Sequence, residues 1–161
     1  LREWCALHGV AWVILRVPAI YGPLRLPIER LRAGLPVLRP DTRDYSNRIH
    51  IDDLARVCFK AITDAPDNTL YNVSDGNPSS FADYLLLLAE LAGLPPLIPM
   101  QDAEDHIDPG MLSFLRESKR IRNAKLLHEL KVTLQHPDVR SGILASLAAM
   151  AGRNLQEESR C

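Results

Sequence analysis

Apolar and polar residues follow one another along the chain in a pattern that predicts alternating strands and helices. Residues 11–17 form an almost continuous apolar run that ends at Pro18, which predicts a strand buried on both faces. Residues 69–74 contain apolar Leu70, Tyr71 and Val73 and predict another strand. Residues 47–51 are predicted to form a short extended segment. The segment after Pro18 is rich in proline and glycine and is expected to be an irregular loop.

Apolar residues at helical spacing predict helices around these strands. We expect Asp52, Ser80, Asn123 and Asp138 to cap the starts of four of them. The polar end of the chain, residues 153–161, is predicted to be a disordered tail. The predicted helices cover residues 1–8, 28–33, 53–65, 81–92, 109–117, 124–130 and 139–151.

Strands separated by helical crossovers predict a parallel α/β sheet. Two clear strands are fewer than a stable sheet needs. The chain also opens inside a helical segment without an initiator Met. We therefore expect a fragment whose further strands precede Leu1.

Composition narrows the class of protein. The 161 residues carry a formal charge of −1, so the basic excess of a nucleic-acid-binding protein is missing. Apolar runs are too short for a membrane span, which needs about 20 residues. The three cysteines are far apart, which argues against a disulfide framework. These features predict a globular cytoplasmic protein that binds neither nucleic acid nor membrane.

Two common kinds of active site are not indicated. The five histidines show no paired ligand spacing and the cysteines are isolated, so no metal site is predicted. The Gly-x-Ser-x-Gly turn of serine hydrolases does not occur in the sequence.

Four strings, in the same order, resemble segments of the extended and atypical short-chain dehydrogenase/reductases. These are the NAD(P)-dependent epimerases and dehydratases of nucleotide sugars and their relatives. The strings are VILRVPAIYGP (13–23), NRIHIDDLA (47–55), YNVSDG (71–76) and ESKRIRN (117–123). The resemblance implies that residues 1–152 are the C-terminal half of such a protein. It would contribute the last strands of a Rossmann-type, doubly wound parallel sheet and a mostly helical substrate lobe.

Two motifs of the resembled family do not occur in this sequence. One is the Gly-rich loop that binds pyrophosphate, and the other is the catalytic Tyr-x-x-x-Lys pair. The resemblance places both before Leu1, so we expect this chain alone to be inactive and to contain no catalytic residue. The alternatives are a non-catalytic NAD(P)-sensing module of the same fold and an inactive truncated product.

The resemblance also assigns a cofactor, NAD or NADP, to the intact protein. Pro18, Ala19 and Ile20 follow the first strand at its C-terminal end, the edge where open α/β sheets bind ligands. In the family this loop lies beside the nicotinamide. Ala19 stands where the family usually has Gly. A strand-end turn without a ligand is the alternative.

Six polar or aromatic residues are candidates for substrate binding. Arg48 suits a phosphate or carboxylate, or else forms a salt bridge with Asp44, Asp52 or Asp53. His50 is expected to bond to backbone and to fix its loop. The implied substrate is a small molecule, a nucleotide sugar or another phosphorylated or anionic compound, and a homodimer is a further expectation. The six candidates are Tyr21, Arg25, Arg48, His50, Lys119 and Arg120, of which the last two could equally form a solvated basic surface.

Overall fold

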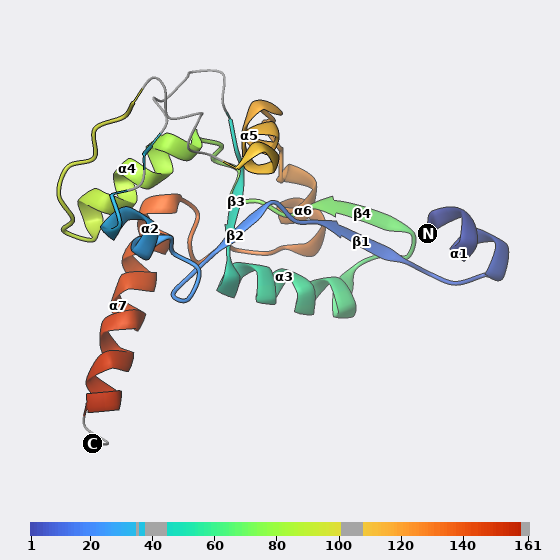
Figure 1. Ribbon diagram of the computed structural model, residues 1–161. Helices are drawn as coiled ribbons and strands as arrows, with labels where there is room; N and C mark the ends of the chain where they lie inside the picture. Colours follow the sequence, from blue (N-terminus) through green and yellow to red (C-terminus); the bar gives the residue numbers. More distant parts are fainter. Residues whose placement is uncertain (35, 38–44, 101–107, 159–161) are drawn as a thin grey trace.

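The computed structural model describes residues 1–34, 36–37, 45–100 and 108–158 (Figure 1). They form short strands connected by helices. In chain order the elements are α1 (Arg2–His8), β1 (Val13–Arg16), β2 (Ala19–Tyr21), α2 (Ile28–Arg32), β3 (Arg48–His50), α3 (Ile51–Asp64), β4 (Thr69–Asn72), α4 (Phe81–Leu91), α5 (Pro109–Arg116), α6 (Ala124–Leu130) and α7 (Val139–Glu158).

The described strands form two parallel pairs, which confirms the prediction of an α/β fold with parallel strands. Strand β1 pairs with β4, with Leu15 opposite Tyr71. Strand β2 pairs with β3, with Ile20 opposite Ile49. In both pairs the partners are joined through a helix, as parallel pairing requires. The chain bends between β1 and β2 at Pro18, so the two pairs run in different directions (Figure 1).

One core cluster covers a single face of the β1–β4 pair. Side chains alternate between the faces of a strand, so Tyr71 and Val73 of the β4 segment point to the same side. There they pack with Val57 of α3 and with Leu126 and Leu130 of α6. Both helices therefore cover the same face of the pair.

The prediction that residues 11–17 form a strand buried on both faces is wrong for this chain. Val13, Ile14 and Leu15 are only half-buried and Arg16 is exposed. Nothing among the described residues pairs with the second edge of β1.

A second cluster joins α2, α4 and α7. The loop after β2 turns α2 toward α4, and the first half of α7 packs on the same side, while its C-terminal end extends away from the body (Figure 1). The buried core of this cluster comprises Tyr21, Ile28, Leu31, Val37, Ala82, Tyr84, Leu85, Leu88, Ala89, Val139 and Ile143.

Several element boundaries differ from the prediction. The segment after Pro18 contains strand β2, which the proline- and glycine-rich sequence concealed. The cap of α3 is His50 and not Asp52, because the helix begins two residues earlier than predicted. Helix α7 continues to Glu158, so most of the expected tail is helical, and residues 159–161 lie outside the described part.

The capping predictions for α4 and α7 are confirmed. The Ser80 hydroxyl accepts a hydrogen bond from the backbone N–H of Asp83, at 2.9 Å. The Asp138 carboxylate accepts one from Ser141, at 2.8 Å. Asn123 precedes α6 without capping it through its side chain, and its amide instead donates to the carbonyl of Ser74. Among the described residues, no helix is both long and apolar enough to cross a membrane.

Candidate functional site

A small groove lies where the chain leaves β1 and enters β3. Its volume is about 120 Å³, and Pro18 lies on its wall, directly before β2. Residues of the loop between α5 and α6 also line it. The lining residues are Pro18, Ser46, Asn47, Glu117, Ser118, Lys119 and Ile121. The groove thus unites Pro18 and Lys119, two of the residues that the sequence singled out.

Asn47 fixes the loop of residues 117–121 against the start of β3. Its amide nitrogen donates to the carbonyl of Lys119 at 2.7 Å, and its amide oxygen accepts from the N–H of Ile121 at 2.9 Å. The side chain is nearly fully buried. Because one amide satisfies two backbone groups, it holds the loop in a single register. Tyr45 adds two further bonds, to Ser118 and to Lys119.

The two basic residues of this loop already have partners. The Lys119 ammonium forms an ion pair with Glu117, and both side chains are more than half exposed. The Arg120 guanidinium lies over the ring of Tyr45, at 3.8 Å from the ring centroid. An anion at the groove would compete with Glu117 for Lys119, and exposed ion pairs of this kind are weak enough to exchange.

The three predicted cofactor-binding residues differ in their surroundings. Pro18 faces the groove. Ala19 begins β2, is exposed, and is paired in register with Arg48. Ile20 is half-buried and packs on the cluster formed with α3 and α6. Their contact with a cofactor stays a prediction.

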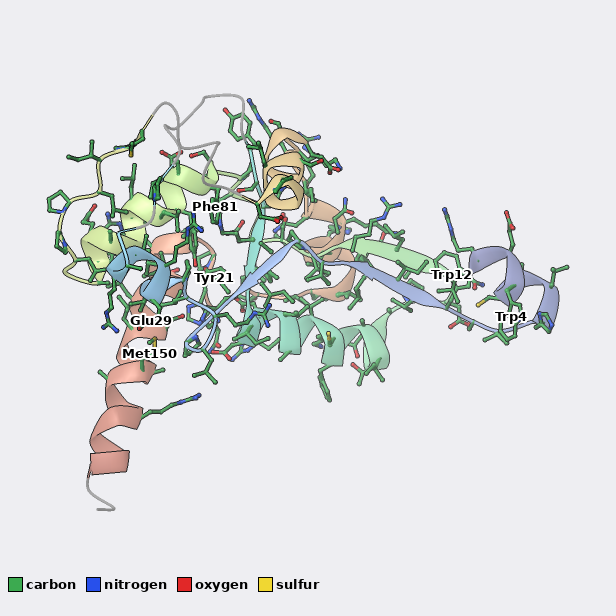
Figure 2. All side chains as sticks on the ribbon, viewed as in Figure 1. Trp4, Trp12, Tyr21, Glu29, Phe81 and Met150 are labelled. Atoms are coloured by element: carbon green, nitrogen blue, oxygen red, sulfur yellow. The ribbon has the colours of Figure 1, made fainter. Side chains whose placement is uncertain are left out.

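Tyr21 is a core residue and does not line the groove. It is labelled in Figure 2 and is only 2% exposed. Its ring meets His50 and Tyr84 edge-on at centroid distances of 5.2 and 6.1 Å. Burial, with a smaller contribution from Asp75, raises the pKa of its phenol far above the ordinary value. The Tyr21 hydroxyl is therefore a neutral donor, aimed at the carbonyl of Asp138.

Arg48 is also buried, and the expected salt bridge to Asp52 or Asp53 is not formed. Its guanidinium instead donates to the hydroxyls of Ser46 and Ser79 and to a backbone carbonyl, that of Ser80. It also lies over the Tyr84 ring, at 4.5 Å from the centroid. Burial lowers the pKa of the guanidinium. The hydroxyls and the carbonyl that accept its hydrogen bonds compensate for its desolvation. The third carboxylate partner considered for it lies outside the described residues.

His50 has the positioning role predicted for it. Its Nδ1 accepts the backbone N–H of Asp52 at 3.3 Å, which fixes the start of α3. The ring is 1% exposed and does not reach the groove. Arg25, by contrast, is exposed, and its Nε donates to the carbonyl of Ile20 at 3.2 Å. The substrate contacts of both residues stay predictions.

Sequence reasoning missed Asn47 as a residue of this site. It stands inside one of the family-like strings, but an asparagine before a short strand carries no signal of its own. Its role depends on the approach of residues 117–121, more than seventy positions away.

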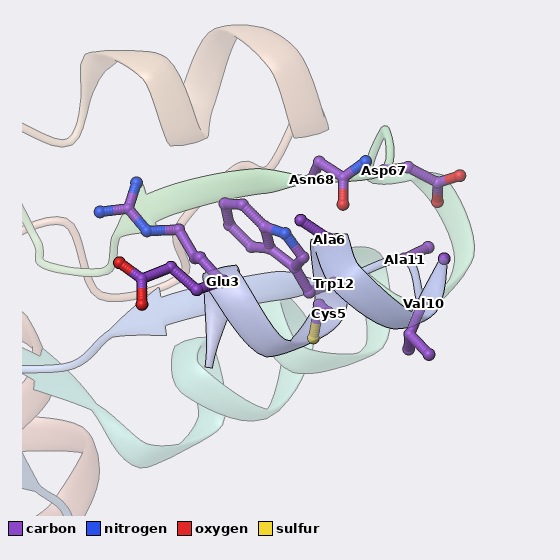
Figure 3. Close-up of a pocket in the computed structure, with 10 residues that line it drawn as sticks. Glu3, Cys5, Ala6, Val10, Ala11, Trp12, Asp67 and Asn68 are labelled. Atoms are coloured by element: carbon purple, nitrogen blue, oxygen red, sulfur yellow. The ribbon is translucent and has the colours of Figure 1, made fainter.

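A larger hollow of about 720 Å³ lies elsewhere, between α1 and the starts of β1 and β4 (Figure 3). Cys5, Trp12 and Asn68 are among its lining residues. None of the predicted cofactor or substrate residues lines it. We therefore assign the candidate site to the smaller groove.

Solved structures share this fold over nearly the whole chain. A conserved protein of unknown function from Silicibacter pomeroyi matches 92% of the chain with a TM-score of 0.83 and 31% identity, and the match covers 52% of that protein. UDP-glucose 4-epimerase from Thermotoga maritima, solved with UDP-glucose, matches 95% of the chain with a TM-score of 0.67 and 18% identity, over 50% of its length. RMD from Pseudomonas aeruginosa, complexed with NADPH, matches 94% with a TM-score of 0.66 and 17% identity, over 52% of its length.

These matches define the fold as a Rossmann-like α/β fold, and the chain spans about half the length of the matched proteins. The resemblance read from the sequence is thereby confirmed: the structural neighbours include members of the NAD-dependent epimerase and dehydratase family, and the chain shares their fold. No family profile and no curated protein matches the sequence.

Proposed function

We propose that this chain is the substrate-side half of an NAD(P)-dependent oxidoreductase of the nucleotide-sugar epimerase and dehydratase type. The observation that carries the proposal is the groove that Pro18, just after β1, lines together with Asn47 and Lys119. The C-terminal ends of parallel strands are where such sheets bind ligands. In this proposal Pro18, Ala19 and Ile20 lie beside the nicotinamide, and the loop of residues 117–121 contacts the substrate.

The size and charge of the groove support a partial site. At about 120 Å³ it is smaller than the roughly 300–1,000 Å³ of a complete small-molecule site. It holds one group of a larger ligand, and the remaining contacts come from the other half of the protein. Lys119, which lines the groove, supplies a cation that suits a phosphate, and Arg120 follows it in the same loop.

The experiment is a titration of the isotope-labelled chain with UDP-glucose, followed by NMR. We expect shifts at the side-chain amide of Asn47 and at the backbone of Lys119, with millimolar affinity. Lys119→Gln weakens this binding about 3-fold, as loss of one exposed ionic contact of under 1 kcal/mol implies. Lys60→Gln, which removes the same charge from α3, leaves the binding unchanged. Absence of shifts at the groove, or equal effects of the two variants, contradicts the proposal.

A second titration tests whether the chain binds NADH or NADPH. The sequence has neither the Gly-rich loop nor Tyr-x-x-x-Lys. We therefore expect NADH and NADPH to bind the chain more weakly than micromolar, and no hydride transfer with UDP-glucose. Tight binding or turnover would show that this half is sufficient by itself, which the proposal denies.

A further inference from the structure

A cluster of two imidazoles and a carboxylate lies at the start of α3, apart from the groove. The Nδ1 atom of His50 is 3.6 Å from an Asp52 carboxylate oxygen, and Nε2 of His136 is 4.0 Å from the same oxygen. One ligand atom from each residue lies within 4.8 Å of the others. His50 and His136 are 86 positions apart in the chain, which is why their spacing in the sequence predicts no metal site.

We propose that His50, Asp52 and His136 bind a divalent transition-metal ion, with zinc as the ion that fits best. Two imidazoles and one carboxylate are a common protein ligand set for zinc. Zinc bonds of about 2.0–2.2 Å in tetrahedral geometry place neighbouring ligand atoms about 3.4 Å apart. The separations of 3.6 and 4.0 Å shorten by about 0.2 and 0.6 Å in that geometry, and the ligand atoms of the two histidines lie within 4.8 Å of each other.

Hydrogen bonds already orient His50 for this role. The hydroxyl of Ser146 donates to the carbonyl of Gly142 at 2.7 Å. Its oxygen is therefore left to accept a hydrogen bond from Nε2 of His50, at 3.1 Å. The proton of the imidazole is thus on Nε2, and the lone pair is on Nδ1, where it accepts the backbone N–H of Asp52 at 3.3 Å. A bound ion would replace this long hydrogen bond. A bond from the far ring nitrogen that fixes the tautomer is typical of metal-bound histidines.

The second histidine is held in place by a buried carboxylate. Asp53 is fully buried and accepts the backbone N–H groups of Gln135 and His136, at 2.7 and 2.9 Å. This positions the connection between α6 and α7 against α3. The His136 ring then lies 4.0 Å from that of His50, between ring centroids.

The charge of the cluster favours a cation at neutral pH. The positive end of α3 opposes a cation, but two carboxylates, those of Asp52 and Asp53, lie in its first turn and offset this effect. Asp52 is largely exposed, which leaves a fourth coordination position open to water.

The test is calorimetric titration of the 161-residue chain with zinc chloride, with the thiols kept reduced. We expect one equivalent to bind. His136→Gln lowers the affinity by about 100-fold or more, and Ser146→Ala, which removes the orienting bond, lowers it by about 10-fold. His128→Gln changes an exposed histidine elsewhere on α6 and leaves the affinity unchanged. The His128 ring is exposed, whereas the His136 ring is 14% exposed and lies against His50, so the melting temperature of each variant without zinc is compared with that of the parent.

Thermal unfolding with and without zinc gives an independent readout, since an ion that binds only the folded chain raises its melting temperature. The melting temperature of the parent and of His128→Gln should rise with zinc, and that of His136→Gln should not. Magnesium should have no effect, because its preferred ligands are oxygens. The proposal is overturned if the parent binds no equivalent of zinc, or if His136→Gln binds it as tightly.

Discussion

Asn47 does more for the candidate groove than any charged residue near it, because one side-chain amide satisfies two backbone groups of the loop of residues 117–121. Neither the carbonyl of Lys119 nor the N–H of Ile121 has a strand or helix partner to replace it. This amide therefore fixes the wall formed by residues 119–121, while Tyr45 holds Ser118 and the N–H of Lys119.

Replacement of Asn47 by Ala is expected to destabilise the chain by about 1–3 kcal/mol, because two partially buried backbone groups lose their partner. Urea unfolding measures the change, and proteolysis should become faster within residues 117–121. Asn72→Ala is the matched control, since the Asn72 amide makes a single long bond of 3.5 Å to the carbonyl of Arg122. Equal losses in both variants would refute the role assigned to Asn47.

The buried carboxyl of Asp75 is expected to make the stability of the folded chain depend on pH. Burial raises the pKa of this carboxyl from 3.8 to about 6, and one of its oxygens has no hydrogen-bond partner among the described residues. The folded chain therefore binds the proton more tightly than the unfolded chain. Its contribution to stability is complete below pH 4 and is lost as the pH rises toward 6 and above.

Asp75→Asn should remove this loss, which we estimate at about 2 kcal/mol between pH 4 and pH 7. The asparagine can keep the bond in which Asp75 accepts the N–H of Asn77, at 2.9 Å. Urea unfolding across this pH range measures the effect, with exposed Asp67→Asn as control. If Asp75→Asn has the pH dependence of the parent, the carboxyl is not the titrating group.

Among the elements, α7 packs closely on β2 because Gly142 has no side chain. A Cβ at Gly142 would lie 2.1 Å from the Tyr21 hydroxyl oxygen and 2.7 Å from its Cζ, inside their contact distances. Because Tyr21 is buried, its ring has no free space into which to move. The close approach of α7 to β2 therefore requires glycine here.

Gly142→Ala is expected to cost about 1–3 kcal/mol through overpacking. Gly152→Ala lies further along the same helix, where a Cβ meets nothing within 4 Å, and should stabilise the chain by about 0.5–1 kcal/mol. Thermal unfolding of the two variants compares them directly. Opposite signs support the contact, and two stabilising substitutions would mean that α7 does not pack on Tyr21.

Local signals predicted the elements better than their pairing. The caps at Ser80 and Asp138 depend on residues three positions apart, so a sequence pattern can reveal them. Strand β2 lies between Pro18 and Gly22, and its partner β3 is nearly thirty positions away, so no local pattern indicates it. The burial of Arg48 and the convergence of His50 with His136 depend in the same way on distant segments.

At the scale of the molecule, the second edge of β1 is the feature that most affects behaviour in solution. The carbonyls of Trp12 and Arg16 accept hydrogen bonds from the β4 segment. Because a residue's N–H and carbonyl point to the same side of a strand and successive residues alternate, the backbone groups of Val13 and Leu15 point away from β4. Among the described strands nothing pairs with them.

Hydrogen exchange followed by NMR should reveal this edge. In dilute solution the amides of Val13 and Leu15 should exchange at least 10-fold faster than that of Ile14, whose N–H faces β4. At high concentration, protection of Val13 and Leu15 would report association of chains through this edge, as unpaired strands favour. Equal protection of all three amides in dilute solution would mean that the edge is covered.

The contact between Tyr21 and Gly142 also limits which residues homologous chains can carry at these two positions. Two positions 121 residues apart compete for the same volume, so their identities are constrained together and not separately. Homologous chains that keep the aromatic ring should retain glycine at the helix position, whereas chains with a smaller residue in the strand can accept alanine or serine there. Covariation of these two alignment columns would thus record the packing of α7 on β2 in sequences whose structures have never been determined.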